Sequence, residues 1–231
     1  MSARRLSQEP QATILCAPFV EAREIDLRRH GARAALLGIP YDMGGIYRSG
    51  AAAGRRGLRE ASRQYGGNFF DDDVFLVDAS RLVDCGDARI VPANPQQCRA
   101  AAKSAAKEII RSGAIGIFIG GDHSIQIPLS EAISEKVPGK VGYIVFDANM
   151  DAEEEVDGEL NLNWSEVCRL AELDNIALSD MALIGIRGAL NTRRQTDNLR
   201  DRGTCVIGMW EVIRRVIEDA MSEALSGECG R

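Results

Sequence analysis

The chain has 231 residues, of which 45% are hydrophobic and 27% charged, with a formal net charge of −6. This length and composition suit one large globular domain or two small ones. The negative charge argues against a nucleic-acid-binding protein, because phosphate binding requires a basic surface. No apolar run reaches the roughly 18–20 residues that span a bilayer.

Apolar runs of strand length recur along the chain and predict strands. Most are nearly continuous rather than alternating, which is typical of strands that are covered on both faces. The runs are residues 34–40, 75–79, 114–121, 140–148, 181–188 and 204–209, of which 75–79 is the weakest.

Helical segments lie between these runs, at residues 54–66, 94–113, 164–173 and 209–227. Gly113 and Gly227 stand where helix C-caps belong. Alternation of strands and helices predicts an α/β fold, a three-layer α/β/α arrangement around a mainly parallel sheet. Residues 1–32 are expected to be an N-terminal leader and extension, and residues 33–231 the α/β domain.

Two polar stretches follow predicted strands. "GGDHS" (120–124) ends one strand and "DANMD" (147–151) ends another. Ligands bind at the carboxyl ends of such strands, and side chains at alternate positions of an extended segment face the same way. We therefore expect Asp147, Asn149 and Asp151 to project together at the edge where His123 arrives.

The donor set predicts a metal site. Carboxylates with one imidazole suit Mn²⁺ or Ni²⁺ better than structural zinc. Each stretch alone has a plainer interpretation: "DANMD" as an acidic loop and "GGDHS" as a tight turn with a capped helix. Asn149 offers only a neutral amide oxygen, a weaker ligand than imidazole.

The cysteines and histidines narrow the chemistry further. The six cysteines are scattered, without the paired spacing of a zinc site, and we expect free thiols and a cytoplasmic protein. The chain has two histidines, His30 and His123. A mechanism in which one chain must supply several imidazoles is therefore excluded.

Over residues 33–227 the sequence resembles the ureohydrolase family: arginases, agmatinases, guanidinobutyrases and the related guanidine and metformin hydrolases. The segments that carry the resemblance are "GIPYDMGGIYRSGAAAGRRGLREAS" (38–62), "VDCGDARIVP" (83–92), "GGDHS" (120–124), "FDANMD" (146–151) and "VIGMWEV" (206–212). In the first, Arg55 stands where the family usually has proline.

The resemblance implies a site with two divalent cations, Mn or Ni, that activate a water for attack on a guanidinium carbon. It implies metal ligands at His123, Asp147 and Asp151, and it places Asn149 at the position of a metal-binding histidine. The catalytic residues stay unknown. The segment "NLNWSEV" (161–167) lacks the family's substrate-side histidine.

The family's third metal motif, S-x-D-x-D-x-x-D-P, would follow the helix that ends near Ser226, and the 231 residues do not contain it. We therefore expect the domain to lack the family's C-terminal part and, alone, a full binuclear cluster.

Two main functions remain open. One is a non-catalytic or assembly subunit of a guanidino or amidino hydrolase, in a homo- or hetero-oligomer (trimer or hexamer) with a catalytic paralogue. The other is an active agmatinase-, guanidinobutyrase- or metformin-hydrolase-type enzyme with an incomplete sequence. A weaker third is a scaffold protein outside any enzyme complex.

Overall fold

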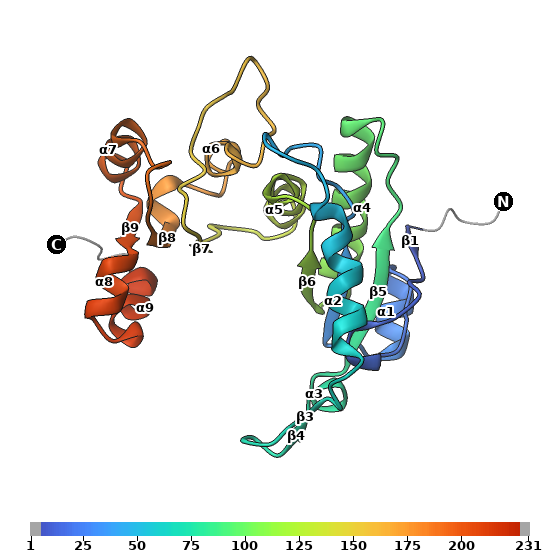
Figure 1. The fold of residues 1–231 in the computed structure, drawn as a ribbon. Coiled ribbons are helices and arrows are strands. Elements are labelled where there is room, and N and C mark those ends of the chain that lie inside the picture. The colour runs from blue at the N-terminus through green and yellow to red at the C-terminus, as the bar shows by residue number, and fades with distance from the viewer. Residues whose placement is uncertain (1–5, 227–231) are drawn as a thin grey trace. The chain divides into compact units, whose positions relative to one another are not determined.

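The computed structural model describes residues 6–226. The chain folds as two compact units, unit 1 within residues 1–136 and unit 2 within residues 137–231, and Figure 1 labels their elements. Each unit has its own parallel strands and its own apolar core. The predicted α/β class with mainly parallel strands is confirmed.

Within the described residues of unit 1, the main sheet contains four strands in the order β1-β5-β2-β6. They are β1 (Ser7–Gln8), β5 (Leu82–Ala88), β2 (Ala34–Gly38) and β6 (Ile115–Ile119). The central strand β2 runs parallel to both β5 and β6, whereas β1 pairs antiparallel with β5. All five residues of β2 are buried, as its continuous apolar run predicts.

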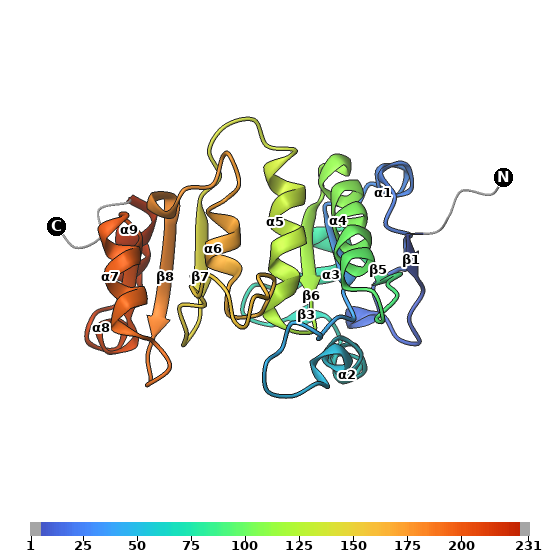
Figure 2. The same cartoon turned by 90° about the horizontal axis from the view of Figure 1, so that it is seen from above.

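Helices cover one face of this sheet. α4 (Pro95–Ser112) lies between α1 (Glu24–His30) and α5 (Gln126–Ser134), as Figure 2 shows. Their buried residues share a core with alternate residues of β2, Ala35 and Leu37.

The opposite face packs against shorter segments. Ala34 and Leu36 of β2 contact residues of the 3-10 helix η1 (Ile14–Cys16) and of α3 (Leu76–Ser80). α2 (Gly54–Ser62) follows the 3-10 helix η2 (Ala51–Ala53). Residues 6–32, expected to be a leader and extension, contribute β1, η1 and α1 to unit 1.

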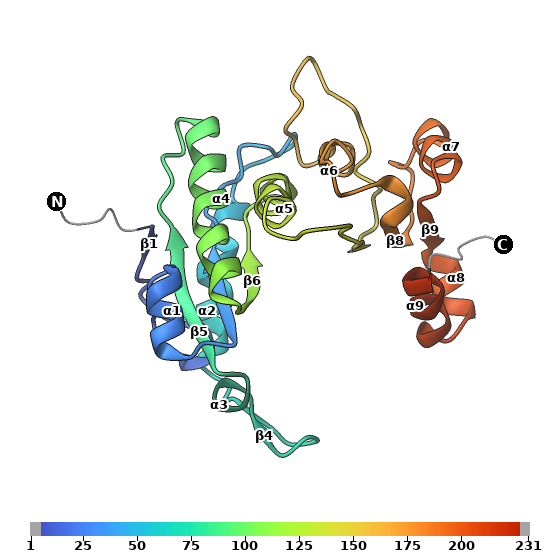
Figure 3. The same cartoon turned by 180° about the vertical axis from the view of Figure 1, so that it is seen from behind.

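The prediction of a strand at residues 75–79 is wrong. Only Val74–Phe75 is extended, as β4, which pairs with β3 (Asn68–Phe69) in a short hairpin. Residues 76–80 form α3 instead. Figure 3 shows the hairpin projecting from the sheet of unit 1. The strand that enters the sheet is β5, and the apolar-run analysis missed it.

Up to Ser226, where the described part of the chain ends, unit 2 contains three parallel strands in the order β7-β8-β9. They are β7 (Tyr143–Phe146), β8 (Met181–Ile186) and β9 (Cys205–Gly208). One face packs against α6 (Glu166–Leu170) and α7 (Arg193–Asp201), and the other against α8 (Met209–Arg214) and α9 (Ile217–Ser226). The 3-10 helix η4 (Leu178–Asp180) precedes β8.

The predicted helices are mostly confirmed, with shorter bounds. Gly113 caps α4 with a φ of 86°. The helix predicted at 209–227 is two helices, α8 and α9, because Arg215 is extended. Gly227, predicted as a C-cap, lies outside the described residues.

A buried ion-pair network joins α2 to β5. Arg59 is 1% exposed and donates from Nε and Nη2 to the two carboxylate oxygens of Asp84, at 2.8 and 2.9 Å. Its Nη1 donates to Asp87 at 2.6 Å. Burial acts to lower the pKa of Arg59, but the hydrogen bonds to the two aspartates outweigh it and raise that pKa. The network explains how two carboxylates can occupy a central strand.

Two further expectations concern the membrane and the thiols. Among the described residues, no helix is long and apolar enough to cross a membrane. Cys16, Cys85, Cys98 and Cys168 are free thiols, as expected. The expectation is wrong for Cys205, which is disulfide-bonded.

Candidate metal centre

The "GGDHS" segment forms a tight turn at the carboxyl end of β6. A Cβ on Gly121 would lie 1.5 Å from the carbonyl oxygen of Tyr41, so only glycine allows this approach of the chain after β2. The amide of Asp122 donates to the same carbonyl oxygen at 3.1 Å. The second glycine of the motif is therefore required by close backbone contact.

Asp122 holds the turn in place. Its Oδ1 accepts from the Ser124 amide at 2.9 Å and its Oδ2 from the Gly44 amide at 2.8 Å. It thereby caps the 3-10 helix η3 (His123–Ile125), in agreement with the capped-turn interpretation. His123 is the first residue of that helix and is half-buried in unit 1.

The "DANMD" segment follows β7 in unit 2, but it is not extended. β7 ends at Phe146, the Asn149 amide donates to Asp147 Oδ1 at 2.9 Å, and Asp151 has a φ of 46°. The prediction that these side chains share a face because they alternate along a strand is therefore wrong. A local turn orients them instead.

Asn191, at the end of the loop after β8, braces this turn. Its side-chain amide donates to the carbonyl oxygens of Ala148 and Arg187, at 2.9 and 2.7 Å. Its Oδ1 accepts from the Met150 amide at 2.9 Å. One side chain thus holds the backbone on both sides of Asn149. In the sequence, Asn191 is only a polar residue that follows a predicted strand, so its role was missed.

The turn brings two of the predicted ligands together. Carboxylate oxygens of Asp147 and Asp151 lie within 4.8 Å of each other, and both residues are half-buried. Asn149 and Asp151 border the same cavity of about 130 Å³, which Trp164 also lines. His123 belongs to unit 1, so its place in a shared centre is a proposal.

A third carboxylate was missed in the sequence. Glu166, the first residue of α6, is 1% exposed. Burial, followed by the charge of Asp151 and a smaller effect of Asp147, raises its pKa well above the ordinary value. The available signal was weak: one acidic residue beside the apolar stripe of Val167 and Leu170.

The donors present in unit 2 fit a hard divalent cation. Two carboxylates within 4.8 Å can bind one ion, and Mn²⁺ accepts carboxylate oxygens with imidazole. The amide of Asn149 is a poor substitute for a histidine. These residues therefore suit one ion better than a full pair.

Comparison with known proteins identifies the family. The model of the arginase family matches residues 32–229. Guanidinobutyrase of Pseudomonas aeruginosa is 28% identical over 92% of this chain, and mitochondrial agmatinase of Gallus gallus is 28% identical over 96% of it. The chain spans 65% and 66% of the lengths of these two relatives.

Solved structures show the same fold. The proclavaminate amidino hydrolase of Streptomyces clavuligerus matches with a TM-score of 0.80 at 24% identity, over 97% of this chain and 71% of that one. A formiminoglutamase of Trypanosoma cruzi, in a structure with Mn²⁺, matches with a TM-score of 0.77 at 22% identity, over 88% of this chain and 70% of that one. Because the family model covers most of its length, this chain belongs to the arginase family of ureohydrolases.

Proposed function

We propose that this chain is a non-catalytic or assembly subunit of a metal-dependent guanidino or amidino hydrolase. The observation that carries the proposal is Asn149, which stands in the turn between Asp147 and Asp151 where the family motif has histidine. An amide oxygen binds a transition metal more weakly than an imidazole does. A chain with this substitution retains the fold and loses much of its metal affinity.

The metal ligands in this proposal are His123, Asp147 and Asp151, and the metal is Mn²⁺ or Ni²⁺. Two such ions, when bound, would activate water for attack on a guanidinium carbon. The residues of this chain contribute three donors and the turn that orients two of them. Asn191 and Asp122 hold the backbone around those donors through hydrogen bonds.

A second candidate is an active hydrolase of a guanidino compound in a longer natural chain. It is favoured by the "GGDHS" turn, in which Gly121 and Asp122 are placed as a rigid support for His123. It is also favoured by the two carboxylates of unit 2, which lie close together. Asn149 counts against it, since additional chain does not change that residue.

In the first candidate, the partner is a catalytic ureohydrolase paralogue in a trimer or hexamer, and the small guanidino substrate binds in that complex. A cytoplasmic location is part of the same proposal; it rests on the free thiols of Cys16, Cys85, Cys98 and Cys168, whereas the disulfide at Cys205 counts against it. The relatives named guanidinobutyrase and agmatinase support a guanidino substrate class.

The test is Asn149→His in the natural full-length chain, with Asn68→His on the β3–β4 hairpin as a control that adds an imidazole outside the turn. Mn²⁺ and Ni²⁺ binding are measured by equilibrium dialysis, and hydrolysis by urea release from agmatine and guanidinobutyrate. Tighter metal binding without hydrolysis supports the subunit. Tighter binding with hydrolysis supports the enzyme.

Unchanged metal binding in Asn149→His would contradict both candidates, because position 149 would then contribute nothing to a metal centre. Substantial hydrolysis by the unaltered chain alone would contradict the subunit proposal directly. The control variant is expected to behave as the parent in both assays.

A further inference from the structure

Unit 1 contains a cavity that the metal-site residues do not line. It has a volume of about 570 Å³ and lies beside the carboxyl ends of β2 and β5, next to the segment that follows β1. Small-molecule sites typically have volumes of roughly 300–1,000 Å³ and occur at this edge of parallel sheets. The position and the volume of the cavity are therefore those of a small-molecule binding site.

The lining is rich in guanidinium groups. Arg55, Arg56, Arg59 and Arg89 line the cavity, against the carboxylates of Glu9 and Asp87. This excess of positive charge occurs in a chain whose net charge is −6. A locally positive electrostatic potential on an otherwise negatively charged chain attracts anions toward the cavity.

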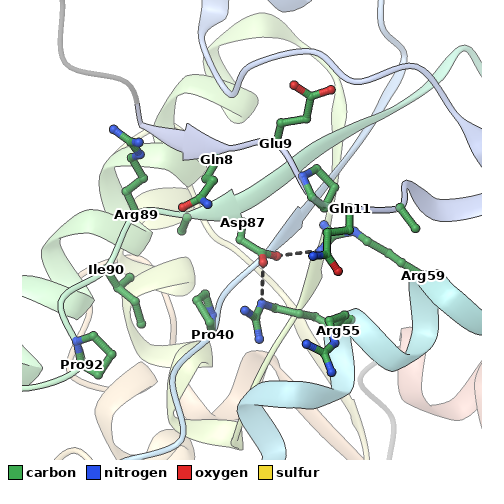
Figure 4. A pocket seen from close by; sticks show the side chains of 14 residues that line it. Gln8, Glu9, Gln11, Pro40, Arg55, Arg59, Asp87, Arg89, Ile90 and Pro92 are labelled. Atoms are coloured by element: carbon green, nitrogen blue, oxygen red, sulfur yellow. Dashed lines mark hydrogen bonds and ion pairs between the residues drawn. The ribbon is translucent and has the colours of Figure 1, made fainter.

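One carboxylate is already neutralised. Asp87 Oδ1 accepts from Arg59 at 2.6 Å, and its Oδ2 pairs with Arg55 Nε at 2.8 Å, as Figure 4 shows. Arg59 is directed into the protein, since it also binds Asp84 and the carbonyl oxygen of Gly86. Arg55 is paired with Asp87 and donates from Nη1 to the carbonyl oxygen of Ala52, so it offers its remaining N–H donors rather than an unpaired charge. The positive charge that faces the cavity therefore comes mainly from Arg56 and Arg89.

The location of Arg55 and Arg56 on α2 adds to the positive electrostatic potential at the cavity. Arg55 and Arg56 belong to the first turn of α2, which contains no acidic residue. The helix dipole places positive charge at this end, where anions are stabilised and cations are not. The side chain of Arg56 is 70% exposed and pairs with Glu60 at 3.4 Å, an arrangement that leaves its guanidinium accessible.

We propose that this cavity binds a small anion that carries a carboxylate or phosphate group, held by Arg55 and Arg56 at the start of α2. Guanidinium groups bind both kinds of oxyanion through paired N–H donors. Arg89, which lies on the far side of Gln8 in Figure 4, contributes positive charge at the other rim.

The experiment is calorimetric titration of the full chain with inorganic phosphate and, separately, with succinate, in buffers matched in ionic strength with chloride. Arg56→Gln is the main variant, because the side chain of Arg56 is 70% exposed and its replacement leaves the core of unit 1 unchanged. Arg55→Gln is the second. Arg29→Gln is the control, since Arg29 is an exposed arginine of the same unit that does not line the cavity.

We expect saturable binding of phosphate, succinate or both, weakened about tenfold by Arg56→Gln and by Arg55→Gln and unchanged by Arg29→Gln. Binding of phosphate alone or of succinate alone identifies the ligand class. Absence of binding beyond the chloride control overturns the proposal. So does binding that both variants leave at parent strength.

Discussion

Replacing Arg59 by alanine tests whether the network between α2 and β5 is structural. Arg59 binds both oxygens of Asp84, and Asp84 is completely buried. The substitution leaves a carboxylate in the core without its cation. Breaking a buried ion pair in this way typically costs about 3–5 kcal/mol.

The structure places the expected loss near the lower end of that range. Asp84 keeps two other donors, the amides of Ile14 and Gly86, both at 2.8 Å. Asp87 is partly exposed and keeps its pair with Arg55 at 2.8 Å. We therefore expect Arg59→Ala to lower the free energy of unfolding by about 3 kcal/mol.

The assay must report on unit 1. Both tryptophans, Trp164 and Trp210, lie in unit 2, so their fluorescence does not directly follow the altered region. Urea unfolding followed by far-ultraviolet circular dichroism gives the overall transition. Hydrogen exchange of peptides from β2 and β5 assigns the loss to unit 1.

Arg56→Ala is the matched control on the same helix. Its pair with Glu60 is exposed, and such pairs contribute about 0–1 kcal/mol. A loss below about 1 kcal/mol for Arg59→Ala, with hydrogen exchange in β5 unchanged, would refute the structural role of this network.

Three further predictions concern single residues. Asn191→Ala should destabilise unit 2 by about 1–3 kcal/mol and weaken Mn²⁺ binding, because the Met150 amide loses its acceptor and the Ala148 carbonyl oxygen keeps only its bond from the Arg187 amide. Urea unfolding curves, followed by tryptophan fluorescence, that match those of the parent would contradict this. The pKa of Glu166 is raised in the folded state, so protonation of its carboxyl group favours folding. This stabilisation is fully present at pH values below the ordinary pKa of 4.5, and it is lost as the pH rises through the folded-state pKa. The metal-free chain should therefore lose stability on going from acid to neutral pH, and Glu166→Gln should reduce that loss; an identical pH dependence of urea unfolding in parent and variant would contradict it. Gly38→Ala should destabilise unit 1 by about 1–3 kcal/mol, since its Cβ would lie 2.1 Å from Asp87 Oδ1. Gly57→Ala, in the open part of α2, should be neutral or stabilising by about 0.5–1 kcal/mol, and equal effects at the two glycines would argue against the close contact.

The sequence predicted the strands whose apolar runs are continuous, such as β2 and β8. It missed β5, because Asp84 and Asp87 interrupt the apolar pattern. Their neutralising partner is Arg59, which is 25 residues from Asp84 in the chain. A pattern of local hydrophobicity does not reveal a pairing over that distance.

The sequence predicted which residues form the candidate site, but it did not predict how the chain arranges them. The motifs identified His123, Asp147 and Asp151, and the structure brings the two aspartates together. It does so through a turn with a left-handed Asp151, braced by Asn191 from 41 residues away. Glu166 was hidden for a related reason, because only tertiary packing buries it beside the aspartates.

The central claim is that this chain, with Asn149 in its metal-binding turn, does not hold a binuclear centre by itself. The most direct test is the number of metal ions per chain, measured by elemental analysis after purification in Mn²⁺ and in Ni²⁺. We expect well under two ions per chain with either metal. A ratio near two would contradict it, since Asn149 would then be no impediment to a complete centre.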